Sequence, residues 1–284
     1  MKLQNVSELI SRSTHEVSIM LRSVFVASAL LLTLPVQAAL DWDTALNGEH
    51  RSESNAARDE FRHPRETLEF FGLREDSTVV ELSPGGGWYT EVLAPLLSQD
   101  GRYYAAQGSA NAGAYPRRAL GAFLIKLGEN DALYGNTIVT EFAPPEAMDI
   151  APEGSADLVL AFRNIHSWMR GDVLEEVLAA VHTALKPGGS FGLVQHRGRE
   201  GITVEEMKNT GYVTEEYVIA AVEAAGLRLE ERSEINANPK DTADYEKGVW
   251  TLPPSLTNGD TDRERYLAIG ESDRMTLRFV KPAE

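Results

Sequence analysis

Apolar and polar residues alternate with two different periods from residue 56 to the end of the chain. Short apolar runs predict strands, and segments whose apolar residues recur every three or four positions predict helices. The predicted strands are residues 78–82, 102–106, 137–142, 157–162, 190–195, 227–231 and 274–280. The predicted helices are residues 56–61, 64–71, 88–97, 173–185 and 215–225. Such alternation is typical of a parallel sheet covered by helices.

Three segments refine this picture. Asp172 precedes the helix at 173–185, where an aspartate can accept a hydrogen bond from a free backbone N–H. Residues 274–280 alternate apolar and polar side chains, as an antiparallel last strand would. Residues 235–273 are polar, contain proline and glycine, and predict an insertion. We therefore expect an α/β fold with a doubly wound, mostly parallel, Rossmann-like seven-stranded sheet and an antiparallel last strand.

The first 38 residues have the pattern of a secretory signal peptide. An apolar run at residues 23–34 follows Arg22, and Val36 and Ala38 are small residues at the third and first positions before a cut. The run is shorter than the roughly 20 residues that span a membrane. We predict cleavage after Ala38 and a mature α/β domain of residues 39–284. It would be periplasmic or secreted and make no membrane contact after cleavage. The alternatives are an uncleaved anchor or a buried helix.

The composition excludes several classes of function. The chain has no cysteine, which excludes disulfides and thiolate metal sites. Its formal net charge is −16, and so acidic a surface repels phosphate backbones. We therefore expect a small-molecule substrate and no nucleic-acid partner. No feature of the sequence specifies an oligomeric state.

A glycine-rich turn follows the first predicted strand. Glycines at 85, 86 and 87 allow a ligand to approach the backbone closely, and ligands of doubly wound sheets bind at such strand ends. A dinucleotide fingerprint would need a third glycine where Thr90 stands, and a nucleoside triphosphate site would need Gly-Lys-Ser or Gly-Lys-Thr. Glu81 ends the strand and can hold a cationic ligand or orient the loop.

Several segments, in this order, resemble the motifs of class I S-adenosylmethionine-dependent methyltransferases. Residues 79–87 (VVELSPGGG) resemble the first motif, an acid followed by a glycine loop. Residues 157–159 with 164–166, residues 185–189 and residues 272–274 resemble three later motifs. Residues 62–64 (RHP) and 85–90 (GGGWYT) resemble an uncharacterised group of exported methyltransferase-like proteins. The resemblance covers most of residues 56–282 and implies the methyltransferase fold, with S-adenosylmethionine as cofactor.

The resemblance also implies which residues meet the cofactor. They are Glu81, Ser83, Gly85, Gly87, Gln107 and Asn164. Two of them depart from the family pattern: Ser83 replaces the first glycine, and Gln107 stands where an acid usually holds both ribose hydroxyls. A glutamine lacks the two charged acceptors of a carboxylate. Glu141 is the nearest acid to the expected place of the adenine amino group.

Two histidines at predicted strand ends are the candidate catalytic residues. His166 follows the fourth strand, where the resemblance puts the methyl group, and His196 ends the fifth strand on the same rim. A histidine near neutrality can remove a proton from the acceptor, and the alternative is a structural role for both. No metal is expected, because His63, His166 and His196 lie on three segments whose spacing specifies no site.

Four further residues leave two interpretations open. Arg62 and His63 either reach the methionine carboxylate of the cofactor, or they cap the following helix and pair with Glu66. Trp88 and Tyr89 either form a wall of the pocket or pack against the sheet, and packing is expected for at least one of them.

The first functional hypothesis is S-adenosylmethionine-dependent methyl transfer to a small molecule, with His166 as the base. Export conflicts with it, because the cofactor is made in the cytosol. The alternative is an exported, non-catalytic protein that binds a small ligand, which the departures at Ser83 and Gln107 favour. A hydrolase that uses His166 and His196 is a third hypothesis, and no Gly-x-Ser-x-Gly motif supports it.

Overall fold

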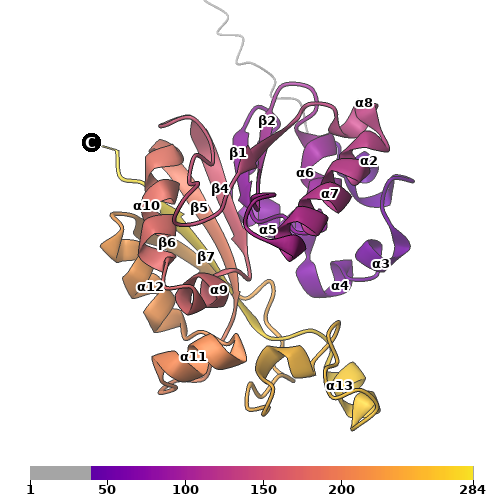
Figure 1. The fold of residues 1–284 in the computed structure, drawn as a ribbon, viewed down its shortest axis with the longest axis vertical. Coiled ribbons are helices and arrows are strands. Elements are labelled where there is room, and N and C mark those ends of the chain that lie inside the picture. Colours follow the sequence, from indigo (N-terminus) through magenta and orange to yellow (C-terminus); the bar gives the residue numbers. More distant parts are fainter. Residues whose placement is uncertain (1–39, 284) are drawn as a thin grey trace, which may run out of the picture. The chain divides into compact units, whose positions relative to one another are not determined.

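Seven strands form one sheet in the order β3-β2-β1-β4-β5-β7-β6 (Figure 1). The strands are β1 Thr78–Leu82, β2 Arg102–Gln107, β3 Thr137–Glu141, β4 Ala156–Phe162, β5 Leu185–His196, β6 Arg228–Ser233 and β7 Arg274–Val280. β1 to β5 pair in parallel, and β7 runs antiparallel to its neighbours β5 and β6. The computed structural model describes residues 40–283, so the predicted signal peptide lies outside the described residues. The predicted fold class is confirmed.

Helices cover both faces of this sheet. They are α2 Trp42–Asn47, α3 Glu53–Ala56, α4 Asp59–Arg62, α5 Pro64–Phe70, α6 Thr90–Leu96, α7 Ala114–Gly128, α8 Asp131–Tyr134, α9 Ile165–Arg170, α10 Leu174–Ala184, α11 Val204–Thr210, α12 Glu215–Ala224 and α13 Arg263–Ile269, with a 3₁₀ helix η1 at Gly248–Thr251. One buried cluster packs residues of α9, α10 and α12 against the sheet, and a second packs residues of α2, α5, α6, α7 and α8 against its other face. Figure 1 shows these two groups on opposite sides of the strands.

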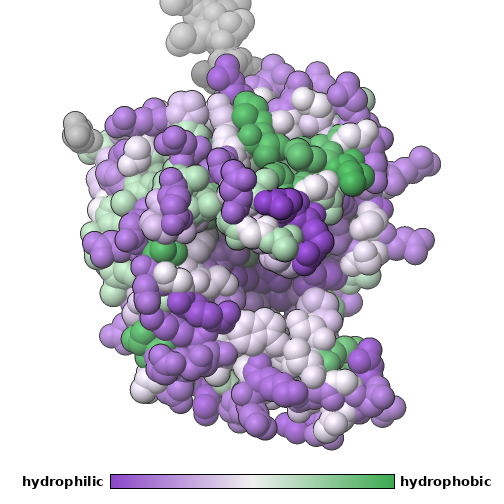
Figure 2. Space-filling view, viewed as in Figure 1, coloured by the Kyte–Doolittle hydropathy of each residue, from purple (hydrophilic) through white to green (hydrophobic). Residues whose placement is uncertain are grey.

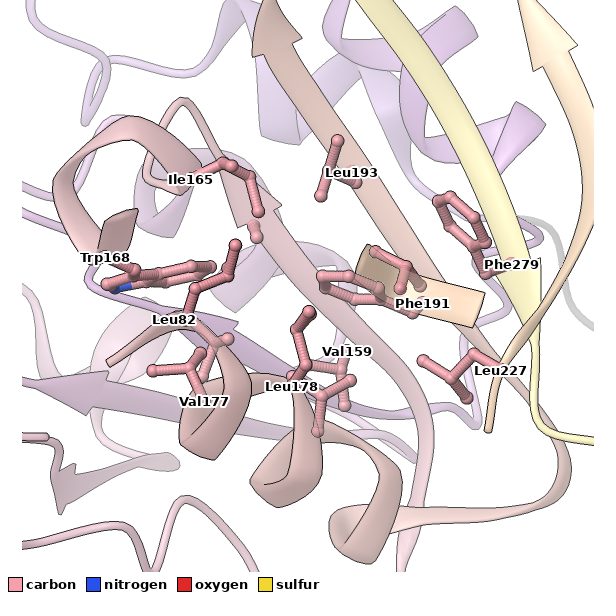
Figure 3. Close-up of a cluster of buried hydrophobic side chains, with 14 of the residues drawn as sticks. Leu82, Val159, Ile165, Trp168, Val177, Leu178, Phe191, Leu193, Leu227 and Phe279 are labelled. Carbon is pink, nitrogen blue, oxygen red and sulfur yellow. The ribbon is translucent and has the colours of Figure 1, made fainter. Parts of the chain in front are cut away.

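Strand β4 shows how one strand serves both cores. Val159 and Ala161 point into the cluster under α10, and Leu158 and Leu160 point into the cluster under α6. Successive strand residues face opposite sides, so a strand covered on both faces must be apolar throughout. Figure 3 shows the first cluster, in which Val177 and other α10 side chains meet the side chains of the sheet. Each fully buried aliphatic or aromatic side chain contributes about 1.5–3 kcal/mol to stability.

The start of α10 differs from the prediction. Asp172 does not cap the helix: its backbone is left-handed, with φ of 52°, and the N-cap residue is Val173, which makes no side-chain capping bond. The Asp172 carboxylate instead accepts a hydrogen bond from Lys208 Nζ at 2.5 Å. An ion pair to α11 therefore takes the place of the capping interaction.

Other helical segments also differ, and α2, α8, α9, α11 and α13 were not predicted. The helix predicted at residues 56–61 is divided into α3 and α4, with a break at Ala57 and Arg58. Helix α7 was not predicted, because its apolar residues follow no single face: Phe123 is buried, whereas Tyr115 and Ile125 are exposed. Without an apolar stripe, the helical period is absent from the sequence.

Residues 235–273, predicted as an insertion, connect β6 to β7 and contain η1 and α13. The segment is fastened at its start, because the buried Asn236 amide donates hydrogen bonds to Thr67 Oγ1 and Thr276 Oγ1, each at 3.0 Å. Figure 1 shows α13 near the end of the sheet at which α9 follows β4. The segment therefore lies where it can contribute to a site at the strand ends.

The close contact between β5 and α5 gives a test of the packing. A Cβ atom added at Gly192 would lie 2.6 Å from Phe71 Cγ and 2.8 Å from Leu160 Cδ2. We expect Gly192→Ala to lower the free energy of unfolding by about 1–3 kcal/mol, through overpacking. Urea denaturation measures the change. Gly121→Ala is the matched control: no atom lies within 4 Å of the added Cβ, so the variant should be as stable as the original protein or slightly more so. Equal stability of the two variants would contradict the packing described here.

Candidate functional site

A cleft of about 440 Å³ lies at the carboxyl ends of β1, β4 and β5. The loop after β1 forms its floor with Ser83, Pro84, Gly85 and Gly86, and the segment after β4 contributes Arg163, Asn164 and His166. The remaining wall consists of Asn55, Arg58, Arg62, Trp88, Phe162, His196 and Trp250. Figure 2 shows a hollow between the body that holds the sheet and the part that carries η1 and α13, surrounded mostly by hydrophilic residues.

The glycine loop has an alternating left-handed backbone. Ser83, Gly85 and Gly87 have φ of 52°, 61° and 80°. Ser83 adopts this conformation although it has a side chain, at a cost of roughly 1–2 kcal/mol. Its N–H donates to Ala106 O at 2.9 Å, and Asn164 Nδ2 donates to Leu82 O at 3.0 Å. The loop is therefore held by β2 on one side and by the end of β4 on the other.

The three glycines of the loop have different surroundings. A Cβ at Gly87 would lie 3.1 Å from Lys126 Cδ and 3.2 Å from Phe123 Cε2, so Gly87 allows α7 to approach the loop. A Cβ at Gly86 would meet no atom within 4 Å. Gly85 and Gly86 therefore present open backbone to the cleft, whereas Gly87 lies beneath it.

Glu81 faces the core rather than the cleft. Its Oε2 accepts a hydrogen bond from Tyr103 Oη at 2.5 Å, and the same hydroxyl lies 2.8 Å from Thr90 Oγ1. Burial raises the pKa of Glu81 to about 7, against the hydrogen bond from Tyr103 and the nearby arginine charges, which lower it. Through Tyr103 and Thr90, this carboxyl group links β1 and β2 to the start of α6.

Gln107 lies between the cleft and a second hollow. Its Nε2 donates to Gly85 O at 3.0 Å, and its Oε1 accepts from Gly108 N at 3.2 Å. The second hollow, of about 370 Å³, is lined by Gln107 and Glu141 together with apolar residues of α7 and β3. The structure thus brings Ser83, Gly85, Asn164 and both histidines into one cleft, and puts Gln107 at the border of a neighbouring hollow.

His166 has a defined tautomer. Gln195 Nε2 donates to Gly211 O at 2.9 Å, which fixes the orientation of the amide, and it lies 3.3 Å from His166 Nδ1. Nδ1 is therefore the acceptor, and Nε2 carries the proton. Burial, assisted by the charge of Arg170, lowers the pKa of His166 to about 4. In this state His166 can donate a hydrogen bond to a ligand, whereas its lone pair is already engaged.

His196 lies 5.8 Å from His166, ring centre to ring centre. Its Nδ1 is 2.6 Å from Ser272 Oγ. Burial holds the pKa of His196 well below its ordinary value, and the charges of Arg274 and Arg163 lower it further. Both candidate catalytic histidines are therefore neutral at pH 7, and the proposed role of each as a base stays a prediction.

Arginines form a large part of the cleft, and the sequence pattern did not reveal how they meet. Arg62 stacks on Trp88, with its guanidinium carbon 4.4 Å from the ring centre, and its Nε lies 3.8 Å from Glu271 Oε2 rather than near Glu66. His63 makes no capping bond to α5 and does not line the cleft. Burial and the neighbouring arginine charges lower the pKa of Arg62 to about 8.

The aromatic residues after the loop divide into two roles. Trp88 lines the cleft, and its Nε1 donates to Asn55 O at 3.0 Å. Tyr89 packs beneath, stacked on Phe162 with ring centres 3.6 Å apart. Trp250 of η1 was not predicted as a site residue, yet it lines the cleft 5.7 Å from the His166 ring. Trp250 lies in the polar segment 235–273, whose apolar residues follow no periodic pattern from which its conformation could be predicted.

Other features of residues 40–283 add no competing site chemistry. Within this range no group of three or more histidine, aspartate or glutamate residues is placed to hold a metal ion. No helix there is both long enough and apolar enough to cross a membrane. A larger, mostly apolar cavity of about 650 Å³ lies among α10, α11 and α12 and contains none of the predicted site residues.

Known structures share this fold. No protein-family model matches the sequence, and no curated protein matches it. An S-adenosylmethionine-dependent methyltransferase from Aquifex aeolicus is 17% identical with a TM-score of 0.53, and the match covers 79% of this chain and 93% of that chain. The [4+2]-cyclase SpnF is 15% identical with a TM-score of 0.52, covering 78% and 81%. A Haloferax volcanii complex of the Trm112 methyltransferase activator with a proposed methyltransferase gives 18% identity, a TM-score of 0.51 and coverage of 87% and 99%. The chain has the fold of class I methyltransferases, and this fold alone does not determine a reaction.

The buried carboxyl group of Glu81 gives a pH-dependent prediction. Because burial raises its pKa from 4.5 to about 7, the folded protein keeps a proton that the unfolded chain loses. The contribution of this retained proton to the free energy of unfolding is fully present below pH 4.5 and is lost as the pH rises through 7. We therefore expect the difference in unfolding free energy between Glu81→Gln and the original protein to change with pH. As the pH rises from 4.5 to 8, it should shift by about 3 kcal/mol in favour of the variant. Urea denaturation at a series of pH values measures this difference. A difference that stays constant with pH would show that Glu81 is ionised in the fold.

The tautomer of His166 gives a second prediction, which NMR can check. In ¹H–¹⁵N spectra of the imidazole groups, we expect His166 to be protonated on Nε2 and to remain neutral down to about pH 5. His166→Asn identifies the signal. A proton on Nδ1 would contradict the hydrogen bond from Gln195. A titration midpoint near the ordinary 6.5 would contradict the burial of the imidazole.

Proposed function

We propose that the protein is an S-adenosylmethionine-dependent methyltransferase that acts on a small molecule after export to the periplasm or the exterior. The observation that supports the proposal most is the open glycine loop between two hollows, at the end of β1 in a sheet ordered as in these enzymes. The signal peptide at residues 1–38 and a single mature domain belong to the same proposal. It requires that the cofactor reach the compartment in which the protein works.

The residues present fit the cofactor in shape. The cleft over Gly85 and Gly86 has room for its methionine part, and the hollow beyond Gln107 has room for its nucleoside part. Leu120, Leu124 and Val139 give that hollow apolar walls suited to a flat ring, and Glu141 at its rim suits an amino group. When bound, the cofactor supplies a methyl group on a positively charged sulfur.

The chain's own residues would position the acceptor. His166 can donate from Nε2, and Arg163 and Asn164 stand on the same strand end. Trp88 and Trp250 form walls that exclude water from the cleft. Alignment of two reactants is the main contribution that a protein makes to a displacement reaction of this kind.

One observation favours the second candidate, an exported binding protein without catalysis. Gln107 turns its amide to Gly85 O and its own neighbour Gly108, so no carboxylate is offered at the place where the family holds the ribose. The [4+2]-cyclase with this fold also shows that the architecture is not restricted to methyl transfer.

Binding of S-adenosylmethionine and S-adenosylhomocysteine by calorimetry tests the proposal. We expect one-to-one binding, and at about 100 times the dissociation constant a stabilisation of roughly 2.7 kcal/mol, seen as a rise of several degrees in Tm. Gly86→Leu should abolish binding without loss of stability, because an added side chain enters the cleft and meets no atom within 4 Å at its Cβ.

Gly121→Leu is the matched control, since position 121 on α7 is equally open and lies outside the cleft. It should bind both compounds normally. The absence of heat and of any Tm shift with either compound at millimolar concentration would leave the exported binding protein as the better account.

A further inference from the structure

The cleft concentrates positive charge in an acidic protein. The chain has a net charge of −16, yet Arg58, Arg62 and Arg163 line the cleft, and among residues 40–283 no aspartate or glutamate lines it. Both histidines of the cleft are held neutral, and arginine charges contribute to this in each case. The local charge is therefore opposite to that of the molecule.

A single carboxylate partly neutralises these guanidinium groups. Glu271 Oε1 accepts from Arg58 Nε at 2.5 Å, and Glu271 Oε2 accepts from Arg274 Nη2 and lies 3.8 Å from Arg62 Nε. Burial alone would raise the pKa of Glu271, but the three arginines lower it to about 2. Arg58, Arg62 and Arg274 thus share one carboxylate, and Arg163 adds a fourth guanidinium group to the same region.

Several donors of these groups have no acceptor. Within residues 40–283, Arg58 Nη2 and Arg62 Nε are buried without a hydrogen-bond partner, and Arg62 is only 4% exposed. No carboxylate in the described part of the chain lies within ion-pair distance of Arg163. Arg62 is thus a buried cation whose contact with Glu271 leaves a donor unused, and Arg163 is a half-buried cation without an ion-pair partner among these residues. An anionic ligand could satisfy both groups.

Arg163 is also held in a strained conformation. Its φ is 65°, in the left-handed region that residues with side chains rarely adopt, and its N–H donates to Val194 O at 2.7 Å. Strain of this kind gathers at binding and catalytic sites. The backbone therefore fixes the point at which the Arg163 side chain leaves the end of β4, at the wall of the cleft.

We infer that the acceptor is a small dianion, a phosphate monoester or a dicarboxylate, bound by Arg58, Arg62 and Arg163. This inference rests on the proposed function and names its substrate class. Guanidinium groups match the geometry of carboxylate and phosphate oxygens, with two parallel hydrogen bonds each. The methionine carboxylate of the cofactor cannot neutralise the positive charge of the cleft by itself, because the cofactor also carries a positive ammonium group and a positive sulfonium group. A second anion would neutralise the charge of the arginines and that of the cofactor, so each ligand strengthens the binding of the other.

Calorimetry of the full chain with inorganic phosphate, succinate and acetate, at constant ionic strength, tests the anion site. We expect phosphate and succinate to bind more tightly than acetate, and Arg163→Gln to weaken their binding about tenfold or more. Arg163→Lys, which keeps the charge, should retain part of the affinity. Arg65→Gln is the matched control, because Arg65 is exposed and pairs only with Glu69 among the described residues. The inference is overturned if none of the anions binds, or if Arg163→Gln binds them as the original protein does.

A second titration separates this inference from the proposed function. With phosphate present, the dissociation constant of S-adenosylmethionine should fall about fivefold or more, and Arg163→Gln should lose this gain. If the anions bind through Arg163 but S-adenosylmethionine binds under no condition, the proposed function is wrong and the anion site stands. If S-adenosylmethionine binds and phosphate does not change its dissociation constant, the proposed function stands and the inferred class of acceptor is wrong.

Discussion

Burial of both faces of the central strands is the constraint on which the site depends. Strand β4 is covered by helices on each side, so its residues from Leu158 to Phe162 are all apolar and almost all fully buried. Polar side chains can appear only where the strand leaves the sheet, and Arg163, Asn164 and His166 follow at once. Gln195 in β5 and Glu81 in β1 are buried polar residues inside strands, so each needs a partner. Gln195 donates to Gly211 O, and Glu81 is the acidic residue of the two. It is accommodated because Tyr103 donates to it and because its raised pKa allows it to be neutral.

A second constraint holds the walls of the cleft together. Glu271 joins Arg58, before α4, to Arg274, at the start of β7, across more than two hundred residues of sequence. Buried ion pairs of this kind contribute little net stability, but loss of one member leaves an uncompensated charge. Their effect is therefore geometric: one carboxylate fixes the relative positions of the N-terminal helices, the segment with η1 and the last strand. Any ligand of the cleft meets arginines whose positions are already set.

The sequence was informative where one local pattern determines the structure. The strands could be located because apolar runs such as residues 78–82 must be buried on both faces. The loop could be located because three adjacent glycines directly after such a run are typical of a turn that approaches a ligand. Helix α7 lacks an apolar face, and Asp172 has an ion-pair partner on α11 that no local pattern shows. The charge of the cleft was equally hidden. Arg58, Arg163 and Glu271 lie on three distant segments, and only the fold shows that they meet.

One of the two departures from the family pattern, Gln107, acquires a physical reason in this structure. Gln107 Nε2 donates to Gly85 O, and a carboxylate in the same place would set two acceptors against each other. An acid there would also add a negative charge beside a cleft that Arg58, Arg62 and Arg163 line. Gln107 therefore holds the glycine loop against the end of β2, and it adds no negative charge to the cleft. No contact of Ser83 explains its replacement of a glycine, since glycine adopts the same left-handed backbone at lower cost. The positive charge around the glycine loop is opposite to the net charge of the chain, and it favours an anionic partner at that place.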